Sequence, residues 1–254
     1  MDGRSWLLLN ASPDLRQQLI ATTALHPRLG ARDTPIAGVF LTNGDVDHIA
    51  GLLSLRERQR FTLYSSPAIL DLIDRDPVFA VLDRQFVKWS AVPAGGRCEP
   101  LENLWLEPVP ILGKVPLYLE SDTVEIGGET EMTSGLEVQG GGWRAIYVPG
   151  CAALTPALLD RTAGADVLFF DGTTYTDDEM VQLGLSHKTA SRMGHIAMAG
   201  PNGSLAAPAD AAVGRKIYTH INNTNPVLVA GSPERAIVEA SGWETAYDGM
   251  EIDL

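Results

Sequence analysis

Three side chains of the kinds that ligate metals follow two expected strands of this 254-residue sequence. Asp47 and His48 come shortly after the buried strand expected at 36–42, and His220 comes directly after the strand expected at 216–219. Two imidazoles and one carboxylate leave coordination positions open, which suits non-haem Fe(II), and zinc accepts the same ligands. The pattern favours one metal site built from Asp47, His48 and His220. The alternative is that Asp47 caps the helix that follows and His48 is a partly exposed neighbour.

Two more titratable residues are candidates for catalysis. Asp171 ends the apolar strand expected at 167–170, so it is either a functional carboxylate or the cap of the turn that follows. His195 lies beside a glycine in a short polar segment, where it can orient a substrate or transfer a proton. An isolated histidine is also commonly structural. Asp171 and His195 are therefore the catalytic candidates, each with a structural alternative.

Further polar residues are candidates for binding the substrate or supporting the metal. They are turn residues before the first metal ligands, an amide cluster after the last one, and two cations: Asn43, Asp45, Asn222, Asn223, Asn225, Lys188 and Arg192. The amides either tie down an irregular loop or bind a polar ligand. The cations, one helical turn apart, either meet a carboxylate-rich ligand or form a solvated helix face. His26 and His187 are expected on the surface.

The elements that must position these residues alternate in an α/β rhythm. Apolar runs and turn signals predict strands at 6–10, 36–42, 61–64, 104–109, 133–138, 143–148, 167–170, 216–219 and 243–247. Capping signals and apolar spacing predict helices at 12–20, 49–55, 67–73, 155–159, 177–183 and 232–242. Residues 95–96 and 110–116 are expected as turns, and 79–89 is ambiguous between helix and strand. No repeat or low-complexity linker divides residues 1–254, so we expect one α/β (α+β) domain with two mixed sheets and helices outside them.

Composition excludes several classes of partner and site. The formal net charge of −13 argues against nucleic acid as a partner, and no apolar run approaches the roughly 18 residues of a membrane span. Cys98 and Cys151 are widely separated thiols without CxxC spacing, which indicates a reducing cytoplasm and no cysteine-built zinc site. The sequence has no GxSxG elbow, P-loop or post-strand GxGxxG, so serine hydrolases, NTPases and dinucleotide-binding folds are not expected.

The turn at 43–48 resembles the metal loop of the metallo-β-lactamase superfamily, which has the pattern HxHxDH after a strand. Only the final Asp-His pair is kept here, as Asp47 and His48, while Asn43 and Asp45 stand at the positions of the two leading histidines. Where hydrolases of the superfamily place a bridging aspartate, this chain has the segment 147–150. The resemblance implies an αββα fold, and the substitutions argue for one metal and oxygen chemistry over a dinuclear hydrolase site.

One branch of that superfamily departs from the pattern in the same way. The segments NASPDLRQQ, TNGDVDHIAGLL, FFDGTTYTDDE, MGHI and THINNTNPVL, at 10–18, 42–53, 169–179, 193–196 and 219–228, resemble the PqqB family of pyrroloquinoline quinone (PQQ) biosynthesis. The resemblance runs over essentially the whole chain. It implies that the iron ligands fall on Asp47, His48 and His220. The family usually begins with a glycine-rich strand and a cysteine cluster that binds structural zinc, and this sequence starts after both, so we expect neither.

The same resemblance implies a function. We expect an Fe(II)- and O2-dependent hydroxylase of the tyrosine ring in the cross-linked Glu-Tyr precursor of PQQ, with zinc as the metal that purification can leave bound. The alternative is a carrier involved in transport of PQQ or its precursor to the periplasm, and a lesser one is a metal-dependent hydrolase. Expected partners are the small-molecule precursor or PQQ and other proteins of the pathway, with a homodimer as the assembly considered. A cytoplasmic location is expected.

Overall fold

A computed structural model describes residues 3–30, 32–120, 128–207 and 212–254. The chain divides into two compact units, each treated by itself below. The first comprises Met1–Pro108 and Val115–Ser121, and the second comprises Val109–Lys114 and Asp122–Leu254. Within the described ranges, no helix is long and apolar enough to cross a membrane.

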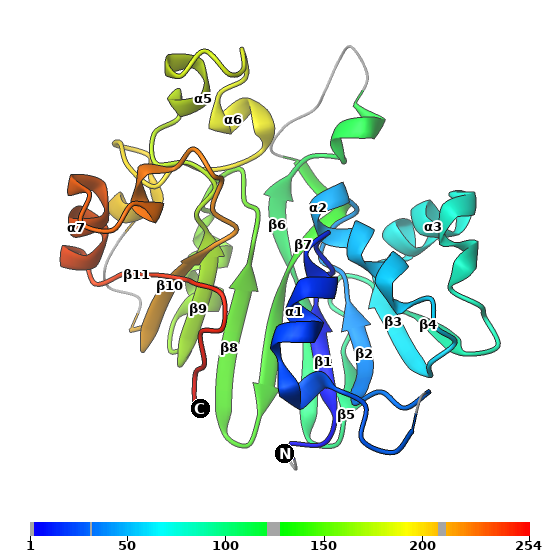
Figure 1. The fold of residues 1–254 in the computed structure, drawn as a ribbon. Helices are drawn as coiled ribbons and strands as arrows, with labels where there is room; N and C mark the ends of the chain where they lie inside the picture. The colour runs from blue at the N-terminus through cyan, green and yellow to red at the C-terminus, as the bar shows by residue number, and fades with distance from the viewer. Residues whose placement is uncertain (1–2, 31, 121–127, 208–211) are drawn as a thin grey trace. The chain divides into compact units, whose positions relative to one another are not determined.

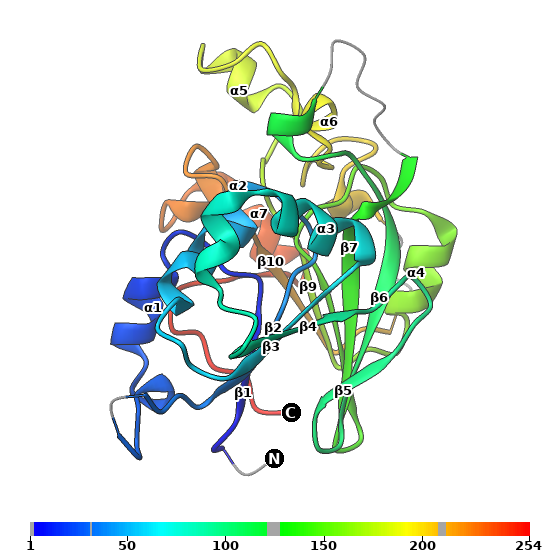
Figure 2. The same ribbon diagram turned by 90° about the vertical axis from the view of Figure 1, so that its right-hand side faces the viewer.

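The first unit is built on a parallel sheet with the strand order β1-β2-β3-β4 (Figure 2). These strands are β1 (Trp6–Leu9), β2 (Ile36–Phe40), β3 (Phe61–Ser65) and β4 (Val87–Ala91). The helices are α1 (Leu15–Ala21), α2 (Val46–Ile49) and α3 (Pro67–Arg75), with 3-10 turns η1 (Thr23–Leu25), η2 (Ala50–Leu55), η3 (Pro77–Val81) and η4 (Leu117–Leu119). Val39, Leu52, Leu63 and Ile69 have no exposed surface and form the centre of the core. We expected both sheets to be mixed, but every described pair in this sheet is parallel.

The second unit contains most of a mixed sheet with the strand order β11-β10-β9-β8-β7-β6-β5. The strands are β6 (Leu104–Gly113), which begins in the first unit, β7 (Gly128–Gly140), β8 (Trp143–Val148), β9 (Val167–Asp171), β10 (Arg215–Thr219) and β11 (Glu244–Thr245). Strands β7 and β8 form the expected antiparallel hairpin, whereas β8 to β11 run parallel. Strand β5 (Cys98–Leu101) pairs with the part of β6 that belongs to the first unit.

Two helices of the second unit, the first and the last, begin where capping residues predict. The helices of this unit are α4 (Pro156–Thr162), α5 (Glu179–Gln182), α6 (Ala190–Met193) and α7 (Pro233–Ala240), with 3-10 turns η5 (Ser204–Ala206) and η6 (Pro226–Leu228). The hydroxyls of Thr155 and Ser232 accept hydrogen bonds from backbone N–H groups three residues on, and a proline occupies the first turn of each helix. Helices α5 and α6 lie beyond the ends of β9 and β10 (Figure 1). They are therefore placed over the strand ends that carry candidate residues.

Some expected boundaries were wrong. The segment 110–116 was expected to be a turn, but β6 continues to Gly113. Pro108 and Pro110 are two residues apart, so both missing N–H groups lie on the same side of the strand, and the pairing with β5 has already ended at Leu106. The ambiguous segment 79–89 is a 3-10 turn followed by strand β4. Strand β5 was not expected, because its four residues have no clear alternation.

Candidate metal centre

The turn before α2 holds its first two polar residues by hydrogen bonds within the first unit. Asn43 Oδ1 accepts from the Asp45 N–H at 2.9 Å, and Asn43 is 4% exposed. Asp45 is the N-cap residue of α2, and its Oδ1 accepts from the Leu117 N–H at 3.2 Å. Both residues therefore stabilise the turn. Asn43 binds the N–H group two positions further on, which is the contact that a turn residue at this place is expected to form.

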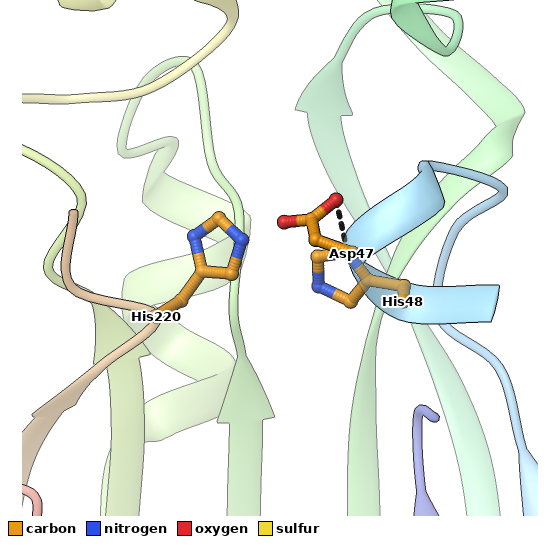
Figure 3. Close-up of side chains that lie close together, drawn as sticks. All are labelled: Asp47, His48 and His220. Atoms are coloured by element: carbon orange, nitrogen blue, oxygen red, sulfur yellow. Dashed lines mark ion pairs between the residues drawn. The ribbon is translucent and has the colours of Figure 1, made fainter. Parts of the chain in front are cut away.

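Asp47 is not a helix cap, because the helix already begins at Val46 and Asp45 holds the N-cap position. Its side chain is 56% exposed and forms an ion pair with His48, in which Asp47 Oδ1 lies 3.3 Å from Nδ1 (Figure 3). The His48 side chain is 5% exposed, and its backbone carbonyl accepts from the Ala11 N–H at 2.7 Å. An exposed carboxylate and a buried, positioned imidazole thus stand next to each other on one short helix.

Gly51 fixes this helix against the segment after β1. Its N–H donates to the Ala11 carbonyl at 2.9 Å, and a Cβ at this position would lie 2.1 Å from the Ser12 carbonyl oxygen. Such a separation is far inside van der Waals contact, so only glycine fits. The close backbone approach holds His48 in place from the other side of the turn.

Asp171 is the centre of the candidate site in the second unit. It ends β9 with 0% exposure, and each carboxylate oxygen receives two hydrogen bonds. Oδ2 accepts from the Cys151 N–H at 3.0 Å and lies 2.7 Å from His195 Nδ1, while Oδ1 accepts from the Thr173 N–H at 3.0 Å and from its hydroxyl at 2.7 Å. Burial acts to raise the pKa of Asp171, but the nearby His195 and the hydrogen bonds outweigh it and lower the pKa below its ordinary value.

His220 joins this network just after β10, where its φ of 53° places it in the left-handed region. Its Nδ1 lies 2.9 Å from the Thr173 hydroxyl, and its ring stacks on that of His195 with centroids 5.4 Å apart. Asp171, His195 and His220 bring possible ligand atoms within 4.8 Å of one another. Figure 3 labels His220 at the end of its strand.

The network assigns the imidazole tautomers. The single hydroxyl proton of Thr173 has two acceptors within reach, Asp171 Oδ1 at 2.7 Å and the His220 carbonyl oxygen at 3.2 Å. The shorter bond to the charged carboxylate is the stronger one, so the hydroxyl donates to Asp171 and its oxygen is left to accept the Nδ1–H of His220. The Nδ1–H of His195 likewise donates to Asp171. With both Nδ1 atoms protonated, each Nε2 carries the lone pair that binds a metal or a proton. Sequence reasoning missed Thr173, although a hydroxyl two residues after a carboxylate at a strand end was the available signal.

The amide cluster ties down the loop after β10, as one of the two alternatives proposed. Asn225 is 1% exposed; its Nδ2 donates to the Gly172 carbonyl at 2.9 Å, and its Oδ1 accepts from Val227 N–H. The Asn222 N–H donates to the Thr173 carbonyl at 3.1 Å. These bonds hold the His220 loop against the turn after Asp171. Asn223 is exposed to solvent.

The two cations do not share a helix face. Helix α6 begins at Ala190 with Thr189 as its N-cap, so Lys188 precedes the helix and the expected one-turn spacing with Arg192 was wrong. Within the described part of the chain, Arg192 Nη1 is buried and has no hydrogen-bond acceptor. His26 and His187 are exposed, as expected.

The cysteines take no part in the ligand clusters of the described residues. Burial raises the pKa of Cys151 to about 12 and that of Cys98 to about 11, so both thiols stay protonated at neutral pH.

Comparison with known proteins places this geometry in a family. Residues 5–221 match the family described as Beta-lactamase superfamily domain. Among solved structures, a new diphosphatase from the PhnP family is 22% identical, with a TM-score of 0.63 over 98% of this chain and 79% of that one. The chain therefore belongs to the beta-lactamase superfamily and has the metallo-β-lactamase fold, with its two sheets and helices.

Closer relatives define the branch. The coenzyme PQQ synthesis protein B of Methylobacterium radiotolerans is 52% identical over 253 residues, covering 100% of this chain and 85% of the relative. That of Xanthomonas campestris pv. campestris is 51% identical over 256 residues, with the same coverage. The crystal structure of Zn(2+)-bound PqqB from Methylobacterium extorquens is 52% identical and has a TM-score of 0.98, over 100% of this chain and 85% of that chain. Within the superfamily, the chain is a member of the PqqB family, which confirms the resemblance.

Proposed function

We propose that the chain acts in PQQ biosynthesis as an Fe(II)- and O2-dependent hydroxylase of the tyrosine ring in the cross-linked Glu-Tyr precursor. Asp47, His48 and His220 are the proposed metal ligands. The observation that carries the proposal is the contact of His220 Nδ1 with the Thr173 hydroxyl at 2.9 Å, which orients the ring and leaves the opposite nitrogen, Nε2, to ligate a metal. The membership in the PqqB family supports the pathway.

The donor set fits a single Fe(II). His48 and His220 supply imidazole nitrogens, and the Asp47 carboxylate is more than half exposed in its own unit. Asn43 and Asp45, at the positions of the two missing histidines, are engaged in the turn, which counts against a second hydrolytic metal. Two histidines and one carboxylate leave positions open, as in non-haem Fe(II) oxygenases. A bound Fe(II) supplies the redox and O2 chemistry that side chains lack.

The remaining residues bind the substrate and move protons. His195 Nε2 is the proposed acceptor of the phenolic proton, because Asp171 holds Nδ1–H and stabilises the imidazolium that results. Arg192 is partly exposed, and its guanidinium is proposed to form a charge-assisted bond with a carboxylate of the precursor. Lys188 and the exposed Asn223 are proposed as further substrate contacts. The product is the ring-hydroxylated precursor.

A carrier role is the second candidate. The relative crystallised with Zn2+, a metal without redox chemistry, and this favours a site in which the metal only orients the carboxylates of PQQ or its precursor. A carrier binds the quinone tightly and consumes no O2 with the precursor. A metal-dependent hydrolase is the third candidate, and it rests on the shared fold alone.

Anaerobic reconstitution with Fe(II), followed by O2 uptake and mass spectrometry with the cross-linked Glu-Tyr diamino acid, tests the proposal. A two-electron donor such as ascorbate is included, because inserting one oxygen atom into the ring leaves the other to be reduced to water. We expect hydroxylated product with Fe(II) and none with Zn2+. Asp47→Ala, His48→Ala and His220→Ala should lose both metal and turnover, whereas the exposed His187→Ala keeps them. Unchanged turnover in the three ligand variants would refute the site, and quinone binding without O2 uptake would favour the carrier.

A further inference from the structure

A cavity lies between the β9–β10 face and α4 in the second unit, apart from the residues assigned above. Its volume is about 80 Å³. Leu168 and Phe170 of β9, Leu159 of α4 and Trp243 before β11 form its apolar wall. This volume is several times the roughly 10–15 Å³ that one water requires, and about half that of an apolar cavity known to hold benzene. The space therefore suits a short apolar chain and is too small for a substituted aromatic acid such as benzoate.

Lys216 places one cation in this apolar lining. It is paired in register with Leu168 on the neighbouring strand, so both side chains point to the same face of the sheet. Its Nζ lies 5.2 Å from the centre of the Trp243 ring and close to the end of α7 at Gly242. The contact with the Trp243 ring is a cation–π interaction. In the described ranges no carboxylate pairs with Lys216, so its ammonium retains donors for an anion.

The polar group at the other side of the cavity is already satisfied. Ser204 is 2% exposed, and its hydroxyl lies 2.7 Å from that of Tyr218. The Tyr218 ring in turn stacks on Trp243, with centroids 4.1 Å apart. The apolar wall is therefore held rigidly, and Lys216 remains the charged group that a ligand in the cavity meets.

We propose that this cavity binds a short-chain aliphatic carboxylate, of the size of butyrate, with its chain against Leu168 and Phe170 and its carboxylate on Lys216. The tail gains from leaving water, and the carboxylate gains a charge-assisted hydrogen bond in a partly desolvated position. The site is independent of the metal centre and of the reaction proposed for it.

Ligand-observed NMR titration of the full chain with butyrate tests this site. Butyrate has about six non-hydrogen atoms, and a ligand of this size is expected to bind with a dissociation constant on the order of 1 mM. Lys216→Met should weaken butyrate binding about tenfold, because it removes one hydrogen bond to a charged group, while binding of the neutral isostere 1-butanol stays the same. Lys88→Met, which removes an equally charged but exposed lysine of β4, is the matched control.

Two further probes test the size of the cavity. Benzoate should not bind, and Leu159→Phe, which fills the space from α4, should abolish binding of both butyrate and 1-butanol. Circular dichroism establishes that each variant is folded. Equal butyrate affinity in Lys216→Met and Lys88→Met, or no saturable binding at about ten times the expected constant, would overturn the proposal and leave a packing void.

Discussion

Replacing Asp171 by asparagine tests the network on which the candidate site depends. Both carboxylate oxygens accept from a backbone N–H, Oδ1 from Thr173 and Oδ2 from Cys151. An asparagine side chain has one oxygen, so either orientation points its NH2 group at one of these N–H donors. One backbone donor loses its acceptor, and the added NH2 group gains one only if the Thr173 hydroxyl or the His195 ring gives up its own donation. Asp171 is fully buried, so water does not replace the lost partner.

The expected loss of stability follows from these contacts. A hydrogen bond to a charged group contributes about 1.5–3 kcal/mol, and an unsatisfied buried donor costs about 1–3 kcal/mol. Asp171→Asn should therefore lower the free energy of unfolding by about 3–5 kcal/mol, a large part of the roughly 5–15 kcal/mol typical of a domain. It also removes the acceptor that holds His195 Nδ1–H, so the ring loses its fixed tautomer.

Urea denaturation followed by circular dichroism measures this loss. The matched control is Asp160→Asn, an exposed aspartate on α4, which should change the free energy of unfolding by less than about 0.5 kcal/mol. If Asp171→Asn costs less than about 1 kcal/mol, the carboxylate is not the acceptor of four donors and the assigned tautomers are wrong.

Three other predictions follow from single contacts. Thr173→Val should keep the fold but weaken metal binding, measured by metal content after dialysis, because the hydroxyl that holds the His220 ring is lost, and Thr173→Ser should restore binding; equal metal content in both variants would contradict this role. Gly51→Ala should destabilise the protein by about 2–3 kcal/mol in urea, because its Cβ meets a backbone carbonyl that cannot move aside, and a change below about 0.5 kcal/mol would show that the turn adapts. Burial raises the pKa of Cys151 from 9.0 to about 12, so the unfolded chain releases this proton first and stability should fall from about pH 9 upward, by up to about 1.4 kcal/mol per pH unit; a Cys151→Ala variant with the same slope would exclude this thiol as the cause.

The sequence by itself determined the local elements and the two segments that carry the proposed ligands. The strands that precede the proposed ligands end at Phe40 and Thr219, within two residues of the ends expected from apolar runs bounded by polar turns. Thr155 and Ser232 cap helices because a hydroxyl and a following proline act within one turn of the chain. The departures from HxHxDH also lie within one short stretch of the chain. The sequence alone therefore showed them and indicated the PqqB branch.

Only the tertiary structure decided how the second unit holds its histidines. Asp171 and His195 are 24 residues apart, and Thr173 and His220 are 47 apart, yet their side chains are within hydrogen-bond distance. No periodicity records such a contact, because it depends on the parallel pairing of β9 and β10 and on the loops beyond them. For the same reason the sequence could not show that the Thr173 hydroxyl reaches His220, and Lys188 and Arg192 were wrongly placed on one helix. Local patterns fix which residues stand at strand ends, whereas sheet pairing fixes which of those ends meet.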